Sequence, residues 1–518
     1  MFESAELGHK IDKATYDKEV PKLREALLDA QFDFAAAKKF EVVILVGGVD
    51  GAGRSETVNL LNEWMDPRHI EVHGMGEPSD EERERPPMWR FWRVLPPEGR
   101  IGVFMGSWYS WPIVDYVYGN IDKEAYHDKI DRIVRFEKML VDEGALLIKF
   151  WFHLSKEAQR KRLKSLEKDP RTRWRVTKRD WTHFELYDKF HEADEQALRM
   201  TSTAEAPWYI IEGADARYRE LTVGKILLEA MRRRLDEKAG LAQASPVPPL
   251  LPSIDKLHVL KSLDLTQALS KKDYERALEE QQGRLVRLAR DPLFKEMSVV
   301  VVFEGNDAAG KGGSIRRITG ALDARQYQVV PIAAPTDEER ARPYLWRFWR
   351  HLSRRGRITL FDRSWYGRVL VERVEGFCAE VDWMRAYGEI NDFEDQLSRH
   401  ETVVVKFWLA TSKEEQMRRF KEREQTGFKR YKITDEDWRN REKWDEYEHA
   451  VCDMVERTST DYAPWTLVES NDKNFARIKV LTTLCDRIET YMEGRRKAVK
   501  KQNGEEAKAT GKGKTKKK

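Results

Sequence analysis

The chain carries an internal repeat that spans almost half of its length. The string PSDEERERPPMWRFWR, which begins at Pro78, returns as PTDEERARPYLWRFWR, which begins at Pro335, so the offset is 257 residues. The same offset pairs Gly48–Gly53 with Gly305–Gly310 without a gap. Because solenoid repeats run to roughly 20–50 residues, a period this long indicates that a whole domain was duplicated. We therefore expect the 518 residues to fold as two related domains.

Composition suggests where these domains begin and end. Residues 237–262 contain the stretch AGLAQASPVPPLLPS, whose prolines cannot continue a helix and which is typical of a semi-rigid linker. We predict a first domain over residues 1–236 and a second over residues 263–494. Residues 495–518 hold eleven Lys or Arg against two Glu, so we predict a basic, disordered tail there.

The charge distribution argues against a general nucleic-acid-binding surface. The formal net charge is +4, but the tail alone carries +9, which leaves the body at about −5. The apolar runs are far shorter than the roughly 20 residues that cross a bilayer, and MFESAELGHK lacks the apolar core of a secretory signal. The three cysteines show no metal-ligand spacing, which is typical of a reducing compartment. We predict a cytoplasmic protein without a membrane or a specific nucleic-acid partner.

Each copy repeats the same order of short apolar strands and longer helical segments. The β-branched runs VVILVG and VVVVFEG are bounded by glycine and are typical of buried parallel strands. Further runs at Ile358–Asp362, Val403–Leu409 and Trp465–Glu469 alternate with helical patterns such as Ser412–Glu424. This order predicts an α/β fold in which each domain is a parallel sheet flanked by helices. Ligands of such sheets bind beyond the carboxyl ends of the strands.

A candidate phosphate loop follows the first strand of the second copy. Residues Gly305–Lys311 match the pattern G-x-x-x-x-G-K, in which backbone N–H groups at a helix N-terminus point toward phosphate oxygens and the lysine reaches them. The preceding valine-rich strand and the matching loop in the first copy strengthen this interpretation. The residues that we expect to contact phosphate here are Gly305, Asn306, Ala308, Ala309, Gly310, Lys311, Gly312 and Gly313.

The loop lacks the hydroxyl residue that usually helps to bind magnesium. Gly312 follows the lysine, where an ordinary P-loop has Ser or Thr. Since Mg²⁺ prefers one or two carboxylates together with water and substrate oxygens, Asp307 and Asp362 are the natural replacements. Asp362 ends a strand and is followed by Arg363 and Arg368, which predicts a charged site. The alternatives are a turn residue at Asp307 and a helix cap or ion pair at Asp362.

A basic helical segment downstream resembles a hinged lid. Residues 413–432 hold eight Lys or Arg against four Glu, and Thr426 and Gly427 interrupt the helical pattern. A solvated helix face is the alternative, but the unpaired cations favour an extended anionic ligand. The lid residues that we expect to bind it are Arg419, Lys429, Arg430 and Lys432.

The repeated motif WRFWR admits two interpretations. Its aromatic residues could stack on a nucleobase, but packing in a core or an interface is the interpretation that we favour. Arg342 and Arg347 stay as candidates for binding phosphate.

Three segments of the second copy resemble the family-2 polyphosphate kinases. They are GNDAAGKGG, TDEERARPYLWRFWR and FDRSWYGRVLVERVEGF, and the likeness extends over residues 42–490. The duplicated length resembles the two-domain subclass, which implies phosphoryl transfer from inorganic polyphosphate to AMP, giving ADP. The resemblance implies phosphate binding by Lys311, metal-linked roles for Asp307 and Asp362, and polyphosphate contacts from the lid. It also implies association into homo-oligomers. We expect Arg363 to share the catalytic role.

The first copy departs from this pattern at the residues that phosphoryl transfer requires. Arg54 and Ser55 stand at the positions of Lys311 and Gly312, and Met105–Gly106 replaces Asp362–Arg363, although Asp50 is retained. We therefore predict that the first domain is inactive. Two other functions stay open, namely an ATP-dependent P-loop kinase of another small acceptor and a non-enzymatic polyanion-binding protein.

Overall fold

The computed structural model describes residues 1–237, 259–427 and 433–514, with side chains as far as residue 501. The chain divides into two compact units, the first formed mainly by residues before 238 and the second mainly by residues after 258. Within the described ranges, the strands of each unit form one five-stranded sheet in which every pair is parallel. The predicted α/β class with tandem domains is confirmed.

The two sheets have the same strand order, as the repeat requires. The first runs β2-β3-β1-β4-β5 and the second β7-β8-β6-β9-β10, each read from the edge formed by the second strand of its copy. The strands of the first unit are β1 (Val42–Gly48), β2 (Ile70–Gly74), β3 (Ile101–Met105), β4 (Leu146–His153) and β5 (Trp208–Glu212). Those of the second are β6 (Ser298–Gly305), β7 (Tyr327–Pro331), β8 (Ile358–Asp362), β9 (Thr402–Ala410) and β10 (Trp465–Glu469).

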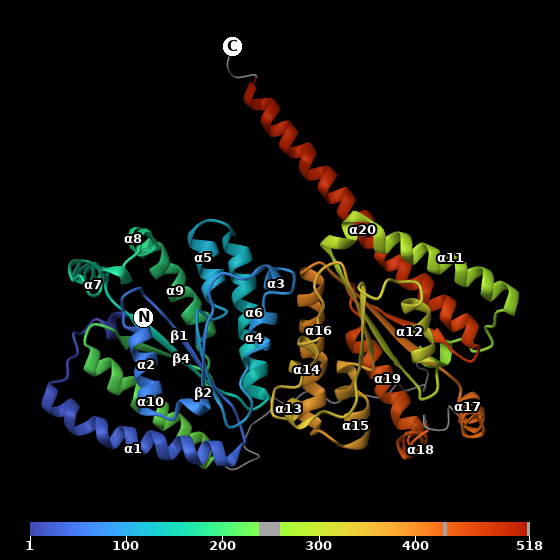
Figure 1. Cartoon of the computed structure of the whole chain (residues 1–518), viewed down its shortest axis with the longest axis horizontal. Coiled ribbons are helices and arrows are strands. Elements are labelled where there is room, and N and C mark those ends of the chain that lie inside the picture. The colour runs from blue at the N-terminus through green and yellow to red at the C-terminus, as the bar shows by residue number, and fades with distance from the viewer. Residues whose placement is uncertain (238–258, 428–432, 515–518) are drawn as a thin grey trace. The chain divides into compact units, whose positions relative to one another are not determined.

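Helices cover both faces of each sheet (Figure 1). One face of the first sheet packs against three helices that share its main apolar core, and the helices of the other face include the long helix that precedes β4. In the second unit the corresponding helices enclose a core of the same kind. The helices of the first unit used below are α1 (Lys13–Ala37), α2 (Arg54–Trp64), α5 (Ser110–Val117), α6 (Lys123–Asp142), α7 (Lys156–Lys168), α8 (Lys178–Glu185), α9 (Tyr187–Thr201) and α10 (Ala216–Asp236). Those of the second are α11 (Lys271–Arg290), α12 (Lys311–Thr319), α16 (Glu380–Arg399), α17 (Lys413–Gln425), α18 (Asp435–Glu442), α19 (Trp444–Thr458) and α20 (Lys473–Lys514).

A buried lysine joins the sheet to a flanking helix in the same way in both units. The ammonium group of Lys406 on β9 donates to Glu394 on α16 at 2.7 Å and to the hydroxyl of Tyr366 at 2.8 Å. In the first unit Lys149 on β4 donates to Glu137 on α6 at 2.7 Å. Because a buried charge is costly without a partner, each lysine requires the glutamate of the helix beside it. The tyrosine of the motif DRSWYGR is thus structural.

The C-terminal helix differs from the sequence expectation. We predicted disorder from residue 495, whereas α20 extends from Lys473 to Lys514. Lysine, alanine and glutamate are strong helix formers, so a helix can continue without burying apolar surface. The boundaries predicted at residues 236 and 262 flank a segment that lies mostly outside the described residues, so they stay predictions. Among the described residues, no helix has the length and apolar character that a membrane span needs.

Candidate active site

The phosphate loop of the second unit closes tightly at the carboxyl end of the central strand β6. Gly305 has φ +149°, and a Cβ built on it would lie 2.5 Å from the carbonyl oxygen of Leu409, so only glycine fits there. Ala308 and Gly310 also have positive φ, of +62° and +115°. Helix α12 begins directly afterwards at Lys311. The predicted strand–loop–helix arrangement is present.

Lys311 folds back over this loop. Its ammonium group donates to the carbonyl oxygen of Gly305 at 2.6 Å and lies 3.4 Å from that of Asn306. Asn306 in turn accepts a hydrogen bond from the backbone N–H of Thr411 at 3.1 Å, which ties the loop to the segment after β9. The lysine is therefore placed at the loop, as the P-loop pattern predicts. The neighbouring Gly312 and Gly313 form the first turn of α12.

Asp307 connects the phosphate loop to three other elements of the second unit. Its carboxylate accepts a hydrogen bond from the guanidinium of Arg363 at 3.3 Å and one from the side-chain amide of Asn440 at 2.9 Å. Its backbone carbonyl accepts from the side chain of Gln416 at 3.2 Å. The loop, the end of β8 and the helices α17 and α18 are thus held together by one residue. A turn residue on the surface would have no such set of partners.

The end of β8 brings Asp362 and Arg363 to the same edge of the sheet. Arg363 has φ +65°, and its backbone N–H donates to the carbonyl of Phe303 on β6 at 3.1 Å. Burial lowers the pKa of Arg363, but Asp307, Glu436 and other carboxylates outweigh this effect and raise it. The carboxylate of Asp362 makes no hydrogen bond or ion pair with a described residue. It is therefore available to a ligand.

The guanidinium of Arg368 forms an ion pair with the carboxylate of Glu372 at 3.2 Å.

Glu304 is a buried carboxylate below the loop that sequence reasoning missed. It is the last residue of β6 before Gly305 and accepts a hydrogen bond from the hydroxyl of Ser364 at 2.8 Å. Burial raises the pKa of Glu304, while the charges of Lys311 and Arg363 act in the opposite direction. A glutamate inside a run of valines was the available signal, since a charged residue in a buried strand calls for a partner.

Arg419 does not act as the sequence predicts. Its side chain is 2% exposed, and all five of its N–H groups are used within the unit. It donates to the carboxylate of Glu415, to the carbonyls of Ala308 and Ala309 in the loop, and to those of Ser470 and Asn471. A guanidinium without a free donor cannot bind polyphosphate, so the prediction is wrong for this residue. Arg419 instead stabilises the phosphate loop by donating to its backbone carbonyl groups.

Of the other cations predicted to bind phosphate, three lie outside the described residues and two contact nearby glutamates. Lys429, Arg430 and Lys432 lie outside the described residues, so their predicted contacts with polyphosphate stay predictions. Arg347 is buried and pairs with Glu339 at 3.2 Å, and Arg342 lies 3.5 Å from Glu338. The aromatic residues of the same motif, Trp346, Phe348 and Trp349, are buried as well, which agrees with a packing role.

Helix α18 supplies further groups that the sequence did not reveal. Besides Asn440, Glu436 lies 3.6 Å from Arg363, and burial together with the charge of Asp307 raises the pKa of Asp437. The hydroxyl of Tyr447 on α19 donates to the side-chain oxygen of Asn440 at 3.1 Å. These residues lie more than 120 positions from the loop in sequence, and no local pattern marks them. Only the fold brings them to Asp307.

The first unit keeps the loop, but different side chains surround its aspartate. Asp50, the counterpart of Asp307, pairs with Arg54 at 2.6 Å and with the imidazole of His183 at 2.9 Å. At the offset of 257 residues, His183 matches Asn440, while Gly47 matches Glu304. The retained aspartate is thus neutralised by its own unit.

A buried arginine also supports the loop of the first unit, but it comes from a different element. Arg219 on α10 donates to the hydroxyl of Thr57 at 2.9 Å and to the carbonyl of Gly213 at 3.0 Å. A Cβ on Gly53 would lie 2.2 Å from its guanidinium carbon. The residue that matches Arg419 in sequence is Arg162, which is exposed on α7. The two copies therefore stabilise the same loop by different means.

The carboxylates of the second unit fit a magnesium site that substrate oxygens complete. The described residues contain no group of three or more His, Cys, Asp or Glu side chains arranged to hold a metal. Mg²⁺ needs only one or two carboxylates when water and phosphate oxygens supply its other ligands. The carboxylate of Asp362 has no partner among the described residues, and Asp307 lies within the loop where phosphate is expected. This donor set suits a metal that arrives with its substrate.

A parallel α/β unit with a strand–loop–helix phosphate motif and carboxylates at the neighbouring strand end defines a P-loop type of phosphotransferase. The family model described as polyphosphate kinase 2 (PPK2) matches residues 10–239 and again residues 268–496. The chain belongs to the polyphosphate kinase 2 family.

Relatives match over nearly the full length. A protein of Pseudomonas aeruginosa named polyphosphate:AMP phosphotransferase is 61% identical over 489 residues, which cover 94% of this chain and 99% of the relative. One of Pseudomonas syringae pv. tomato with the same name is 55% identical, covering 94% and 98%. A crystal structure described as polyphosphate kinase 2 from Pseudomonas aeruginosa PA01 has a TM-score of 0.86 at 57% identity and covers 96% of this chain and all of that one.

Proposed function

We propose that this chain is a polyphosphate:AMP phosphotransferase that converts AMP to ADP in its second unit. The name is carried by relatives up to 61% identical that match almost end to end. The observation that carries the assignment to the second unit is the meeting of Lys311, Asp307 and Arg363 around one phosphate loop. The first unit has arginine, aspartate and glycine at these three positions.

The reaction joins two anions, so repulsion is its first obstacle. A phosphate oxygen of AMP attacks the terminal phosphorus of polyphosphate, a P–O bond forms, and the bond to the next phosphate of the chain breaks. The products are ADP and a polyphosphate shorter by one unit. Because the attacking oxygen is ionised near neutral pH, no strong general base is needed, and charge stabilisation dominates.

Each residue of the site has a role that follows from its position. Lys311 at the loop and Arg363 at the end of β8 neutralise charge on the transferred phosphoryl group. Asp307, held from two sides by Arg363 and Asn440, orients the acceptor and the cation rather than removing a proton. Arg368 and the lid cations stabilise the remaining phosphates of the donor.

Asp307 and Asp362 are the residues that would hold Mg²⁺. When bound, the metal supplies positive charge against the phosphate oxygens of both substrates. We expect removal of divalent cations with a chelator to abolish ADP formation and re-addition of Mg²⁺ to restore it. Asp362→Asn should raise the Mg²⁺ concentration needed for half-maximal rate, because the amide is a weaker ligand.

We also propose that the first unit does not transfer phosphoryl groups. Its loop has no lysine, its strand end has no aspartate, and Asp50 is already paired with Arg54 and His183. A cytoplasmic location and association into homo-oligomers stay predictions.

The test is a product assay with one acceptor and two donors. Purified protein is incubated with AMP, Mg²⁺ and either polyphosphate or ATP, and ADP is quantified by chromatography. ATP alone with AMP also yields ADP in an adenylate-kinase reaction, so polyphosphate-only conditions decide. We expect ADP with polyphosphate in the absence of ATP. If ADP forms only with ATP, the chain is a conventional kinase, and if no product forms with either donor, it is a binding protein.

A further inference from the structure

The first unit carries a strongly basic segment at the place that matches the lid of the second unit. Residues 156–179 hold eleven Lys or Arg against three Asp or Glu, a net charge of +8. At the offset of 257 residues, residues 413–436 hold eight against six, a net charge of +2. The unit that we propose not to transfer phosphoryl groups therefore has the more basic segment, so phosphoryl transfer does not explain this charge.

Four carboxylates of the second unit are absent from the matching positions of the first, and they account for the whole difference. Ala158, Ser165, Lys178 and Arg179 stand where the second unit has Glu415, Glu422, Asp435 and Glu436. In α17, Glu415 pairs with Arg418 at 2.6 Å and with Arg419 at 2.7 Å. The basic residues at the matching positions of α7 lack this partner.

The basic segment forms one surface of the first unit. It consists of α7, the short helix η3 (Arg173–Arg175) and the start of α8, and both η3 and α8 contact α7 (Figure 1). Six of its cations are exposed, and their side chains form no hydrogen bond or ion pair with a described residue. We call these six the basic face: Arg160, Lys161, Lys164, Lys168, Arg173 and Lys178.

Four residues of the basic face lie on one side of α7. Arg160, Lys164 and Lys168 follow one another at intervals of four residues, Lys161 lies beside them, and the buried residues of the helix lie on the opposite side. The two acidic residues of α7 pair with none of them. Because like charges at this spacing destabilise a helix, the arrangement does not serve the stability of the fold. It is suited to a ligand that neutralises it.

An extended polyanion fits the basic face better than a compact anion. The stretch from Arg160 to Lys168 spans about 12 Å at 1.5 Å per residue. Arg173 and Lys178 extend the face beyond the end of α7. A chain with a negative charge on every phosphate can contact such cations one after another, whereas a single phosphate reaches only part of them.

Bases would find few aromatic partners on this surface. Proteins that bind single-stranded nucleic acid stack successive bases on several aromatic side chains. Residues 156–179 contain one aromatic residue, Trp174, and the guanidinium of Arg175 lies 5.4 Å from the centroid of its ring. The basic face therefore favours a polyanion without bases. Inorganic polyphosphate is the polyanion that the proposed function requires.

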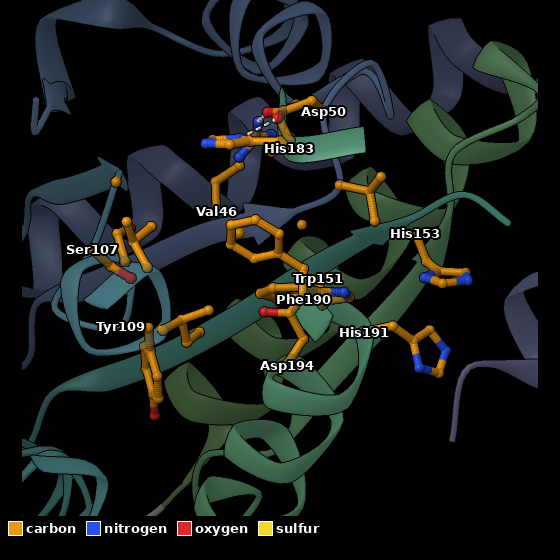
Figure 2. Close-up of a pocket in the computed structure, with 18 of the residues that line it drawn as sticks. Val46, Asp50, Ser107, Tyr109, Trp151, His153, His183, Phe190, His191 and Asp194 are labelled. Atoms are coloured by element: carbon orange, nitrogen blue, oxygen red, sulfur yellow. Dashed lines mark hydrogen bonds and ion pairs between the residues drawn. The ribbon is translucent and has the colours of Figure 1, made fainter. Parts of the chain in front are cut away.

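The cavity at the loop of the first unit is a less favourable place for this polyanion. Asp50 lines the cavity, pairs with Arg54 at 2.6 Å and lies 2.9 Å from an imidazole nitrogen of His183 (Figure 2). Asp180 lines it as well and opposes the charge of Arg179. Positive charge without a carboxylate partner is thus concentrated on the exposed helices rather than at the loop.

We propose that the basic face of the first unit is a docking surface for inorganic polyphosphate, distinct from the site of phosphoryl transfer. This inference rests on the proposed function, in which polyphosphate is the donor. A chain long enough to reach both units is held at two places, so its effective concentration at the second unit rises without any new contact there. The unit without transfer chemistry thereby contributes to the affinity for the donor.

Titration of end-labelled long-chain polyphosphate with the full-length protein, followed by fluorescence anisotropy, tests this proposal. The combined variant Arg160→Gln, Lys164→Gln and Lys168→Gln should bind about 10-fold more weakly in about 0.1 M salt. The slope of log K against log salt should fall by about 2, because three fewer contacts release counterions. The KM for polyphosphate should rise with kcat unchanged, since the basic face touches no reacting atom.

A matched variant on another helix controls for net charge. Lys13→Gln, Lys18→Gln and Lys22→Gln together remove the same charge from exposed positions of α1. We expect this variant to bind polyphosphate within about twofold of the wild type, because the loss of distant exposed charges is screened by salt. Glutamine is a good helix former, so neither combined variant should lower the melting temperature.

A third variant leaves every cation in place. Ser165→Glu copies Glu422, which lies 3.5 Å from Arg418 in the second unit. It gives Lys161 a carboxylate four residues away, so we expect polyphosphate binding to weaken by about threefold.

Three results would overturn the proposal. The first is wild-type affinity in the variant of α7, and the second is an equal loss of affinity in the variant of α1. The third is binding of single-stranded RNA that is tighter than that of polyphosphate and is lost in the variant of α7, which would identify a nucleic-acid surface. The titration needs neither AMP nor turnover, so it decides about the basic face even if no ADP forms and the proposed function fails.

Discussion

The loop lysine provides the sharpest test at the scale of single residues. Lys311→Met should lower kcat by about 10² to 10³, because it removes one preorganised positive charge from the transferred phosphoryl group. Arg54→Met at the matching position of the first unit is the control and should leave kcat unchanged. Steady-state rates of ADP formation measure both. An equal loss in the two variants would show that both units take part in transfer.

Arg419 should contribute more to stability than to binding. Arg419→Met removes five hydrogen bonds and leaves buried carbonyl groups without partners, so we expect a loss of about 3 kcal/mol in the free energy of unfolding. Arg418→Met, a neighbour that is 61% exposed, should cost less than about 1 kcal/mol. Chemical denaturation of both variants provides the measurement. A stable Arg419 variant with weak polyphosphate binding would restore the role predicted from sequence.

Glu41 predicts a pH dependence of stability. It is 4% exposed, and burial raises its pKa from 4.5 to about 8, with Glu98 and Glu143 adding to the effect. Between these values the folded state binds a proton that the unfolded state has released, so stability falls as the pH rises. Glu41→Gln should therefore stabilise the protein by roughly 4 kcal/mol at about pH 9 and have little effect at about pH 4.

Denaturation curves across this pH range test the assignment, with Glu25→Gln on the exposed side of α1 as the control. A stabilisation by Glu41→Gln that does not vary with pH would mean that the glutamate is not the group that titrates.

At the scale of elements, the central strands could be predicted and the edge strands could not. Strands β6 and β9 are valine-rich and buried on both faces, and such runs are distinctive in a sequence. Strand β7 has one buried residue in five and lacks a continuous apolar run, so it resembles a loop. The loop glycines were predictable for a similar reason, since positive φ favours glycine, whereas the positive φ of Ala308 and Arg363 was not.

The contact between helix α18 and Asp307 should tune the rate. Asn440→Ala removes the 2.9 Å hydrogen bond that orients the carboxylate, so we expect kcat to fall by about 5- to 10-fold. Asp435→Ala, on an exposed position of the same helix, is the control. Stopped-flow measurement of ADP formation separates this effect from binding of AMP. A change in KM alone would place Asn440 in substrate binding rather than in positioning.

At the scale of the whole molecule, the two units should differ in their contribution to turnover. Asp307→Ala should reduce ADP formation by more than about 10²-fold, because the acceptor and the cation lose their common ligand. Asp50→Ala should leave the rate close to that of the wild type. If Asp50→Ala abolished turnover while Asp307→Ala did not, the roles of the units would be reversed.

The tandem architecture was predictable because the repeat pairs motifs of the two copies at one constant offset. The family was predictable from three segments of the second copy. The partners of those motifs were harder to foresee. His183 and Asn440 occupy the same position in the repeat, and each contacts the loop aspartate of its own unit, His183 through an imidazole nitrogen and Asn440 through its side-chain amide. These partners lie more than 100 residues from the loop in sequence, so no local sequence pattern predicts which group the fold places next to the aspartate.

The different arginines behind the two loops bear on how easily the first unit could regain activity. Arg419 reaches the phosphate loop from α17, the helix that begins the lid. A movement of the lid would therefore act directly on the loop. Arg219 reaches the loop of the first unit from α10, which lies outside the segment that matches the lid. A variant of the first unit with Arg54→Lys and Met105→Asp would regain the charges but not the arginine contact between the lid helix and the loop. The divergence of the copies is thus harder to reverse than their few substituted site residues suggest.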